Sequence, residues 1–448
     1  MPSDALFGPS FSTSAMLEAT SERAWLTAML RVEAALAAAE SHVGLIPLAA
    51  AQAISTRCEA ADYDIEQLGR DAVRSANPVI PLVAALRQKV GPTFASYAHV
   101  GATSQDVVDT AMMLIAKNVL DLIVGELDRA ANAAAALADR HRLTLMAART
   151  LMQQASVTTF GLKAAGWVNA IVEARQDLDR VRRTRLALQL GGSTGTLAAF
   201  SDKGLEVAKT MAAELDLREP VVPWLSARGR IAELANGLGL AAGVAGKVAL
   251  DVVLLGQTEV GEVTEGKAAG KGGSSAMPQK QNPVQAIEIL SAVRGVNAQV
   301  GLLQQAMVQE HERAAGAWQA EWPALTECLR LTGGAAARLA DVLTGIHVYP
   351  ERMRRNLDLT GGLVMAESVV VGLARRVDGL TARALVDRAV ATAQSGGRPF
   401  AQVLKEDRQI SGYLDSTTLA NALDPASYTG QAEELIDRAL KAYREIKE

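Results

Sequence analysis

The residues best suited to chemistry lie in one glycine- and serine-rich segment, Gly270-Lys-Gly-Gly-Ser-Ser-Ala-Met-Pro-Gln-Lys-Gln-Asn-Pro283. Its glycines allow backbone conformations that other residues avoid, and among them stand the hydroxyl group of Ser274 and the ammonium group of Lys280. Asn282 followed by proline predicts a helix start, with Gln285 as a capping-box partner. Because N–H groups at a helix start favour an anion, the pattern predicts a mobile, hydroxyl-bearing loop beside an anion site. A flexible linker before a capped helix would look the same.

Four further segments gather polar side chains in a way that is unusual for plain helix: His99–Asp106, Arg149–Thr159, Gln257–Glu262 and Gln309–Arg313. The first places an imidazole, two hydroxyl groups and an amide around a glycine, although Thr103 or Ser104 could simply cap the helix that follows. The second is a polar cluster within an otherwise apolar, helical region. The last precedes Trp318 and Trp322, which suggests the wall of a ligand site, whereas a Glu-His-Glu-Arg run alone is usually a solvated surface.

Composition excludes several function classes. The chain has 448 residues, of which 49% are hydrophobic and 21% charged, as in ordinary globular proteins. A net charge of −4 gives no electrostatic footprint for nucleic acid. The five histidines show no paired metal-ligand spacing, and Cys58 and Cys328 lie far apart, as expected for two buried thiols in a reducing compartment. We expect no secretory signal, because Met1–Ser10 has no basic region followed by an apolar run, and no membrane span, because charged residues interrupt each apolar run. We therefore expect a cytoplasmic protein.

Proline spacing organises the elements that must position these segments. No proline falls between Pro92 and Pro220, or between Pro223 and Pro278, so long helices can run there. Apolar residues at three- and four-residue steps predict helices over about 106–142, 158–190, 228–262, 283–309 and 318–346. Alternating strand patterns are nearly absent, so we predict an all-α protein. Its domains are an N-terminal helical domain over 1–105, a central long-helix bundle over 106–350 that carries the mobile loop 266–283, and a small helical domain over 351–448.

The segment Gly273–Pro283 resembles the signature loop of the fumarase/aspartase superfamily, and the other segments follow in the order that this superfamily requires. Within it, His99–Asp106, Gln309–Trp322 and Arg355–Thr360 most closely resemble the bacterial 3-carboxy-cis,cis-muconate cycloisomerases, and the similarity covers essentially the whole chain. The resemblance implies an all-α, three-domain fold with a long central helical bundle. It further implies a homotetramer whose active sites are shared between three subunits, no metal or organic cofactor, and a small polycarboxylate substrate.

The resemblance also implies roles for individual residues. Ser274 matches the loop serine that exchanges a proton with the substrate carbon, and Lys280 and Asn282 match residues that hold a substrate carboxylate. Positions of the substrate pocket are matched by His99, Thr103, Ser104, Gln153, Gln154 and Arg313. The implied reaction is lactonisation of 3-carboxy-cis,cis-muconate to a carboxymuconolactone, a step of aromatic catabolism in the protocatechuate branch of the β-ketoadipate pathway.

One position departs from the pattern. Gln154 stands where adenylosuccinate lyases have a histidine that acts as acid or base, and an amide cannot transfer a proton at neutral pH. An amine leaving group needs such a donor, which contributes roughly 10²–10⁴-fold to rate. A carboxylate needs none, because its conjugate acid has a pKa near ~4. The glutamine therefore favours cycloisomerisation over an amine-releasing, fumarate-forming lyase. A cycloisomerase for a 3-sulfo or other substituted muconate and a non-catalytic structural homologue stay open.

Overall fold

The computed structural model describes residues 6–266, 272–273, 277 and 279–447, and it divides into two compact units. Unit 1 comprises Met1–Asp128, Glu173–Lys247 and Ile287–Leu339. Unit 2 comprises Arg129–Val172, Val248–Ala286 and Ala340–Glu448. Each unit is therefore built from three separated stretches of chain. The predicted division into domains 1–105, 106–350 and 351–448 stays a prediction.

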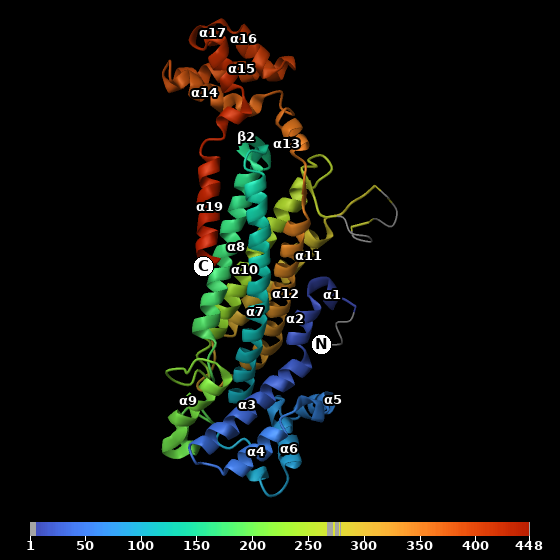
Figure 1. The fold of residues 1–448 in the computed structure, drawn as a ribbon, viewed down its shortest axis with the longest axis vertical. Helices are drawn as coiled ribbons and strands as arrows, with labels where there is room; N and C mark the ends of the chain where they lie inside the picture. Colours follow the sequence, from blue (N-terminus) through green and yellow to red (C-terminus); the bar gives the residue numbers. More distant parts are fainter. Residues whose placement is uncertain (1–5, 267–271, 274–276, 278, 448) are drawn as a thin grey trace. The chain divides into compact units, whose positions relative to one another are not determined.

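Five long helices form the framework of both units, and the all-α fold class is confirmed (Figure 1). They are α7 (Ser104–Arg140), α8 (Phe160–Arg185), α10 (Gly229–Leu255), α11 (Val284–Gln305) and α12 (Ala317–Gly345). Each contributes residues to both units. Their bounds differ by a few residues from the five predicted helices, because proline gaps and apolar spacing mark long helices clearly and mark their ends poorly.

Shorter helices complete unit 1: α1 (Gly8–Phe11), α2 (Ser14–Ala19), α3 (Glu22–His42), α4 (Leu48–Thr56), α5 (Ile65–Ala72), α6 (Val79–Val90) and α9 (Gly204–Leu215). Helix α3 begins where the Ser21 hydroxyl accepts a hydrogen bond from the Ala24 N–H, and it packs against α4 and α9 (Figure 1). A core that includes Ile54, Leu86 and the fully buried Ala98 joins α3, α4 and α6. His99, the first predicted pocket residue, therefore follows directly after a residue of this core.

In unit 2, residues 145–159 form a β-hairpin instead of helix. Strands β1 (Leu145–Thr150) and β2 (Gln153–Thr159) pair antiparallel, and the turn between them places Leu151 and Met152 at φ values of 49° and 67°. The prediction of a helical region around Arg149–Thr159 is wrong here. No glycine, asparagine or aspartate marks this turn, so the usual hairpin signal is missing from the sequence. The hairpin packs on α13 (Pro350–Leu357), and a short sheet pairs β3 (Val263–Thr264) with β4 (His347–Val348).

The remaining helices of unit 2 are α14 (Ala366–Ala374), α15 (Gly379–Gly396), α16 (Phe400–Glu406), α17 (Arg408–Tyr413), α18 (Ser416–Ala422) and α19 (Ala432–Lys447). Helices α14 to α18 share an apolar core that includes Leu373, Leu385, Phe400 and Leu404. Aspartates cap three of these helices through side-chain oxygens: Asp378, Asp407 and Asp415.

Two described helices, α10 and α11, are long and apolar enough to cross a membrane by length and composition alone. Charged residues do interrupt both helices, as the sequence predicts: Lys247 and Asp251 in α10, and Glu288 and Arg294 in α11. Half of the apolar window of α10 is buried, but only 28% of that of α11. Leu240, Leu250, Ile287 and Leu302 are each between 39% and 49% exposed. A single chain thus leaves apolar surface of these helices uncovered.

Candidate active site

Arg313 brings two polar segments together in unit 1. Its guanidinium donates one hydrogen bond to Thr103 Oγ1 at 3.1 Å and another to the Ser193 carbonyl oxygen at 3.0 Å. Arg313 and Ser193 are exposed, while Thr103 and Ser104 are half-buried at the start of α7. Among the described residues no carboxylate pairs with Arg313, so its charge is available to an anionic ligand. This contact joins Thr103 and Arg313, and their membership of one substrate pocket stays a prediction.

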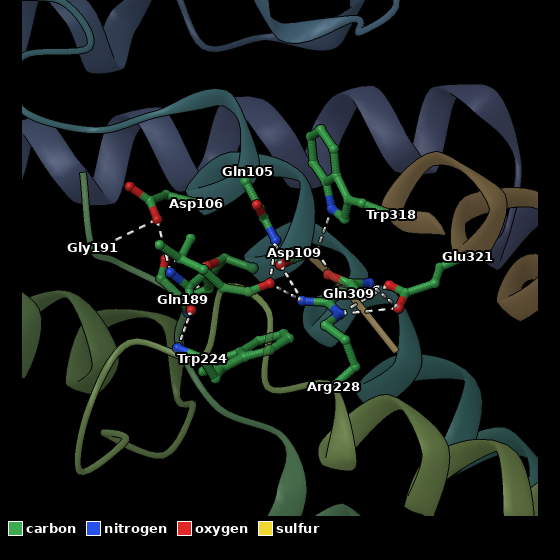
Figure 2. A network of polar contacts seen from close by, with 12 residues as sticks. Gln105, Asp106, Asp109, Gln189, Gly191, Trp224, Arg228, Gln309, Trp318 and Glu321 are labelled. Atoms are coloured by element: carbon green, nitrogen blue, oxygen red, sulfur yellow. Dashed lines mark hydrogen bonds and ion pairs between the residues drawn. The ribbon is translucent and has the colours of Figure 1, made fainter. Parts of the chain in front are cut away.

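The buried carboxylate of Asp106 holds the loops on which these residues lie. One oxygen accepts hydrogen bonds from Gln189 Nε2 at 2.9 Å and Gly191 N–H at 3.0 Å (Figure 2). The other accepts from Gly192 N–H at 2.9 Å and Thr103 N–H at 3.0 Å. Burial raises the pKa of Asp106 to about 6, although the four hydrogen bonds favour the ionised form. One carboxylate therefore fixes both the Thr103 loop and the glycine loop that follows α8.

Two glycines allow these loops to approach each other. Gly101 and Gly192 have φ values of 73° and 68°, in the left-handed region that favours glycine. A Cβ atom on Gly192 would lie 2.8 Å from the Gly101 carbonyl oxygen, and one on Gly101 would lie 2.5 Å from the buried Phe200 ring. Neither site has room for a side chain, so the two loops are held in direct backbone contact.

A second buried network fixes the other side of the Arg313 segment. Arg228, with no side-chain exposure, binds Asp109 of α7 and Glu321 of α12 through its guanidinium (Figure 2). Burial alone would lower the pKa of Arg228, but the two carboxylates raise it above its ordinary value. Gln309 Nε2 donates to Glu321 Oε1 at 3.2 Å. The network thereby anchors the start of the segment that carries Arg313.

Of the two tryptophans predicted to form a ligand wall, Trp318 is buried and Trp322 lines a cavity. Trp318 is 4% exposed and donates from Nε1 to Asp109 Oδ1 at 2.9 Å, so it belongs to the buried network (Figure 2). Trp322 packs edge-on against Trp318 and lines a separate cavity of about 440 Å³, together with Trp25, Met29 and Leu82. No predicted pocket residue lines this cavity.

In unit 2, Gln154 joins a chain of hydrogen bonds. Its Nε2 donates to the Asn356 carbonyl oxygen at 2.9 Å, and Asn356 Nδ2 donates to Glu262 Oε1 at 2.7 Å. The Arg149 guanidinium binds both oxygens of the fully buried Glu262, at 2.7 Å and 2.9 Å. Gln154 Oε1 is buried and has no partner among the described residues. Gln153 is exposed and pairs with Thr150 next to the hairpin turn.

The signature loop is described only in part. Ser274 lies outside the described residues, Lys280 is exposed and Asn282 is half-buried. The Asn282 N–H donates to the Gly272 carbonyl oxygen at 2.9 Å, and Gly272 has a φ of 75°. This hydrogen bond joins Gly272 to Asn282, which lies two residues before the start of α11.

The start of α11 is capped differently from the prediction. Glu265 Oε1 accepts from the Ala286 N–H at 2.7 Å, and Glu265 Oε2 accepts from the Gln285 N–H at 3.3 Å. The expected capping box of Asn282 and Gln285 is therefore wrong. The Glu265 carboxylate thus occupies two N–H groups of this helix start, where the sequence suggested a site for an external anion.

Comparison with known proteins decides the family. A family model described as "Lyase" matches residues 9–301, more than half of the chain, and one described as "Adenylosuccinate lyase C-terminus" matches residues 362–439. The chain belongs to this lyase family. The fumarase/aspartase resemblance of the sequence is thereby confirmed.

Individual lyase-family relatives match over nearly their full length. A 3-carboxy-cis,cis-muconate cycloisomerase of Bradyrhizobium diazoefficiens is 44% identical over 438 residues, 97% of each chain. A nitrosuccinate lyase of Streptomyces davaonensis is 42% identical over 433 residues, 94% of this chain and 91% of the relative. The crystal structure of the 3-carboxy-cis,cis-muconate lactonizing enzyme of Pseudomonas putida has a TM-score of 0.93 and 40% identity, covering 99% of this chain and all of that one. Relatives of nearly equal identity thus carry different names.

The structure of this lyase-family chain adds residues that the sequence analysis missed. Asp106 was visible as part of a candidate segment, but nothing in the sequence indicated that it ties that segment to Gly191 and Gly192. Ser193 lies in the glycine-containing run Gly191–Gly195, which follows the helix predicted over 158–190 and belongs to none of the candidate segments. Glu33, on α3, bonds to His99, and no local spacing connects two residues that lie 66 positions apart. The predicted pocket residues fall into two groups, one on each unit.

Proposed function

We propose that this lyase-family protein is a cofactor-independent cycloisomerase that converts 3-carboxy-cis,cis-muconate to its carboxymuconolactone. The observation that carries the proposal is Gln154, whose amide donates to the Asn356 carbonyl oxygen. It occupies the position of a proton-donating histidine without supplying a proton. Lactonisation needs no donor for its reacting oxygen, because the nucleophile is a carboxylate of the substrate itself. The names of several relatives that match 92% or more of the chain point to the same reaction.

The proposed reaction takes up one proton overall. A substrate carboxylate oxygen forms a bond to C4 of the diene, and the π electrons of C4 and C5 move to C5. The resulting enolate, conjugated with the neighbouring carboxylate, then takes a proton at C5. Positive groups near that carboxylate stabilise the charge as it develops, an effect commonly worth several kcal/mol. We assign this task to Lys280, which brings a positive charge, and to Asn282, which brings an amide N–H donor, while Arg313 is assigned to substrate binding. Ser274 delivers the proton.

We further propose a homotetramer with active sites shared between three subunits. The apolar tip of the β1–β2 hairpin supports assembly, because Leu151 is 97% exposed and Met152 69% exposed in a single chain. The half-exposed leucines and isoleucine of α10 and α11 support it also. We also propose a cytoplasmic location, which fits the two free cysteines, Cys58 and Cys328.

A second candidate is a lyase that eliminates nitrite from nitrosuccinate. Gln154 favours this candidate as well, because nitrite, like a carboxylate, leaves as a weakly basic anion and needs no proton donor. A relative with that name is 42% identical. An amine-releasing lyase has no comparable support, because its leaving group requires the proton that Gln154 cannot give.

The two candidates separate in one set of assays. Purified protein is mixed with 3-carboxy-cis,cis-muconate, its 3-sulfo analogue or 2-nitrosuccinate, and kcat/KM is measured from loss of the diene absorbance or from nitrite release. The proposal predicts the largest kcat/KM with the carboxy compound. A larger kcat/KM with the sulfo compound would identify that compound as the substrate of the cycloisomerase. Nitrite release as the dominant activity would contradict the cycloisomerase proposal and favour the nitrosuccinate lyase.

The Ser274 assignment has its own test. Ser274→Ala should lower kcat by at least about 100-fold, the usual range for loss of a proton-transfer group, with little change in KM. Ser275→Ala, one residue away, is the matched control and should keep turnover near that of the parent. Substantial turnover by Ser274→Ala would rule out serine as the proton donor.

A further inference from the structure

His99 is held in a constrained position by groups behind it. Its backbone has a φ of 60°, an uncommon value for a residue with a side chain. The preceding Ala98 is fully buried, and its carbonyl oxygen accepts hydrogen bonds from Arg87 Nη2 at 3.0 Å and Nε at 3.3 Å. The loop therefore fixes where the His99 ring leaves the backbone before any ligand is present.

Glu33 fixes the ring itself. His99 Nδ1 lies 2.7 Å from Glu33 Oε1, and the side chain of Glu33 is 0% exposed, whereas that of His99 is 14% exposed. The second oxygen, Glu33 Oε2, is buried and has no hydrogen-bond partner among the described residues. Because Nδ1 is occupied, Nε2 is the ring nitrogen that remains for a ligand, and it has no partner in the described part of the chain.

Among the charged groups around the ring, some raise the pKa of His99 and others lower it. Burial alone would lower the pKa of His99, but the Glu33 carboxylate outweighs burial and raises the pKa above its ordinary value. Of the other facing groups, Arg87 lowers the pKa and Asp106 raises it. Glu40, on the same helix as Glu33, is itself held largely neutral because burial raises its pKa to about 8. The His99–Glu33 pair thus favours the imidazolium form more than the surroundings of an ordinary histidine do.

We propose that Glu33 is a positioning residue of the active site, which holds His99 so that Nε2–H is presented to a substrate carboxylate. The inference rests on the proposed function, because that substrate is a polycarboxylate. Among the predicted pocket residues His99 is the one whose ordinary pKa lies near neutrality, so it sets the pH range of substrate binding. The protein would bind polycarboxylates well below the pKa of His99 and lose affinity as the pH rises through it.

The test measures ligand binding and the titration of His99, so it examines the His99–Glu33 pair without relying on turnover. Binding of propane-1,2,3-tricarboxylate is measured by calorimetry from mildly acidic to alkaline pH for the parent, Glu33→Gln, Glu40→Gln and His99→Gln. In parallel, NMR follows the ring signal of His99, assigned by its loss in His99→Gln. We expect a parent titration midpoint above 6.5, the ordinary value for histidine. In Glu33→Gln this midpoint and the pH at which affinity is lost should both move to lower pH.

The controls decide between positioning and general structural damage. Glu40→Gln replaces a neutral buried acid by a neutral amide on the same helix and should leave both midpoints in place. His99→Gln should weaken binding roughly tenfold or more at acidic pH, as expected for a lost charged hydrogen bond, and should remove its pH dependence. A parent midpoint at or below 6.5, or an unchanged affinity profile in folded Glu33→Gln, would overturn the proposal. Because neither measurement needs catalysis, failure to turn over muconate would count against the proposed reaction alone.

Discussion

At the residue scale, single buried carboxylates position the half-buried groups that can contact an anion. Asp106 accepts four hydrogen bonds and so fixes Thr103 relative to Gly191 and Gly192. Glu33 does the same for His99. The sequence identified the half-buried partners by type and by resemblance, but it could not identify their supports. A buried carboxylate carries no local signal of which distant N–H group it will meet, so its role becomes visible only once the helices are packed.

Asp106 gives a pH-dependent prediction. Its pKa is about 6 in the folded chain against an ordinary 3.8, so the folded protein holds the proton more tightly than the unfolded chain does. The stability that Asp106 contributes is therefore greatest below about pH 4 and declines as the pH rises toward about 6. The free energy of unfolding of the parent minus that of Asp106→Asn should fall across this window. Denaturant unfolding at several pH values measures it, and a flat or rising difference would show that the native carboxyl is not destabilised by burial.

At the element scale, long helices were predictable and their supporting contacts were not. Proline gaps and apolar spacing located α7, α8, α10, α11 and α12. The β1–β2 hairpin was missed because Leu151 and Met152 form its turn without any glycine. The cap of α11 was misassigned because Glu265 lies 20 residues before the first N–H group that it binds. The two failures differ in cause: the hairpin turn lacks its usual local signal, whereas the α11 cap is a contact between distant residues that local patterns do not encode.

Arg228 links three helices and gives a prediction at this scale. It lies at the start of α10 and binds Asp109 of α7 and Glu321 of α12, with all three side chains fully buried. Arg228→Met should leave two carboxylates without their cation and cost roughly 3–5 kcal/mol of unfolding free energy. Arg180→Met, which removes an exposed pair with Asp177, is the matched control and should cost less than about 1 kcal/mol. Equal losses in the two variants would contradict the role given to the buried network.

At the scale of the whole molecule, a single chain leaves apolar surface exposed. The tip of the β1–β2 hairpin presents Leu151 and Met152 to solvent, and α10 and α11 present further apolar side chains. Surfaces of this kind mark interfaces in soluble proteins. They support the proposed tetramer, which the sequence suggested only through its family resemblance.

The hairpin tip allows a direct test of assembly. Leu151→Glu places a charge at a 97% exposed position, where an isolated chain would tolerate it. If the tip lies in a subunit interface, the variant should dissociate into smaller species and lose activity in proportion. Analytical ultracentrifugation measures the species present, and Leu205→Glu, at a 75% exposed position on α9, is the control. An unchanged sedimentation profile for Leu151→Glu would place the hairpin tip outside the interface.

The most direct test of the proposed reaction is the identity of the product. Purified protein is incubated with 3-carboxy-cis,cis-muconate in D₂O, and the product is examined by NMR. We predict a five-membered lactone that carries one deuterium at the former C5 of the substrate. This carbon lies next to the terminal carboxylate that does not close the ring, and it takes a single proton equivalent when the enolate is protonated. An unreacted diene, recovered from protein that does turn over 2-nitrosuccinate, would contradict the cycloisomerase assignment.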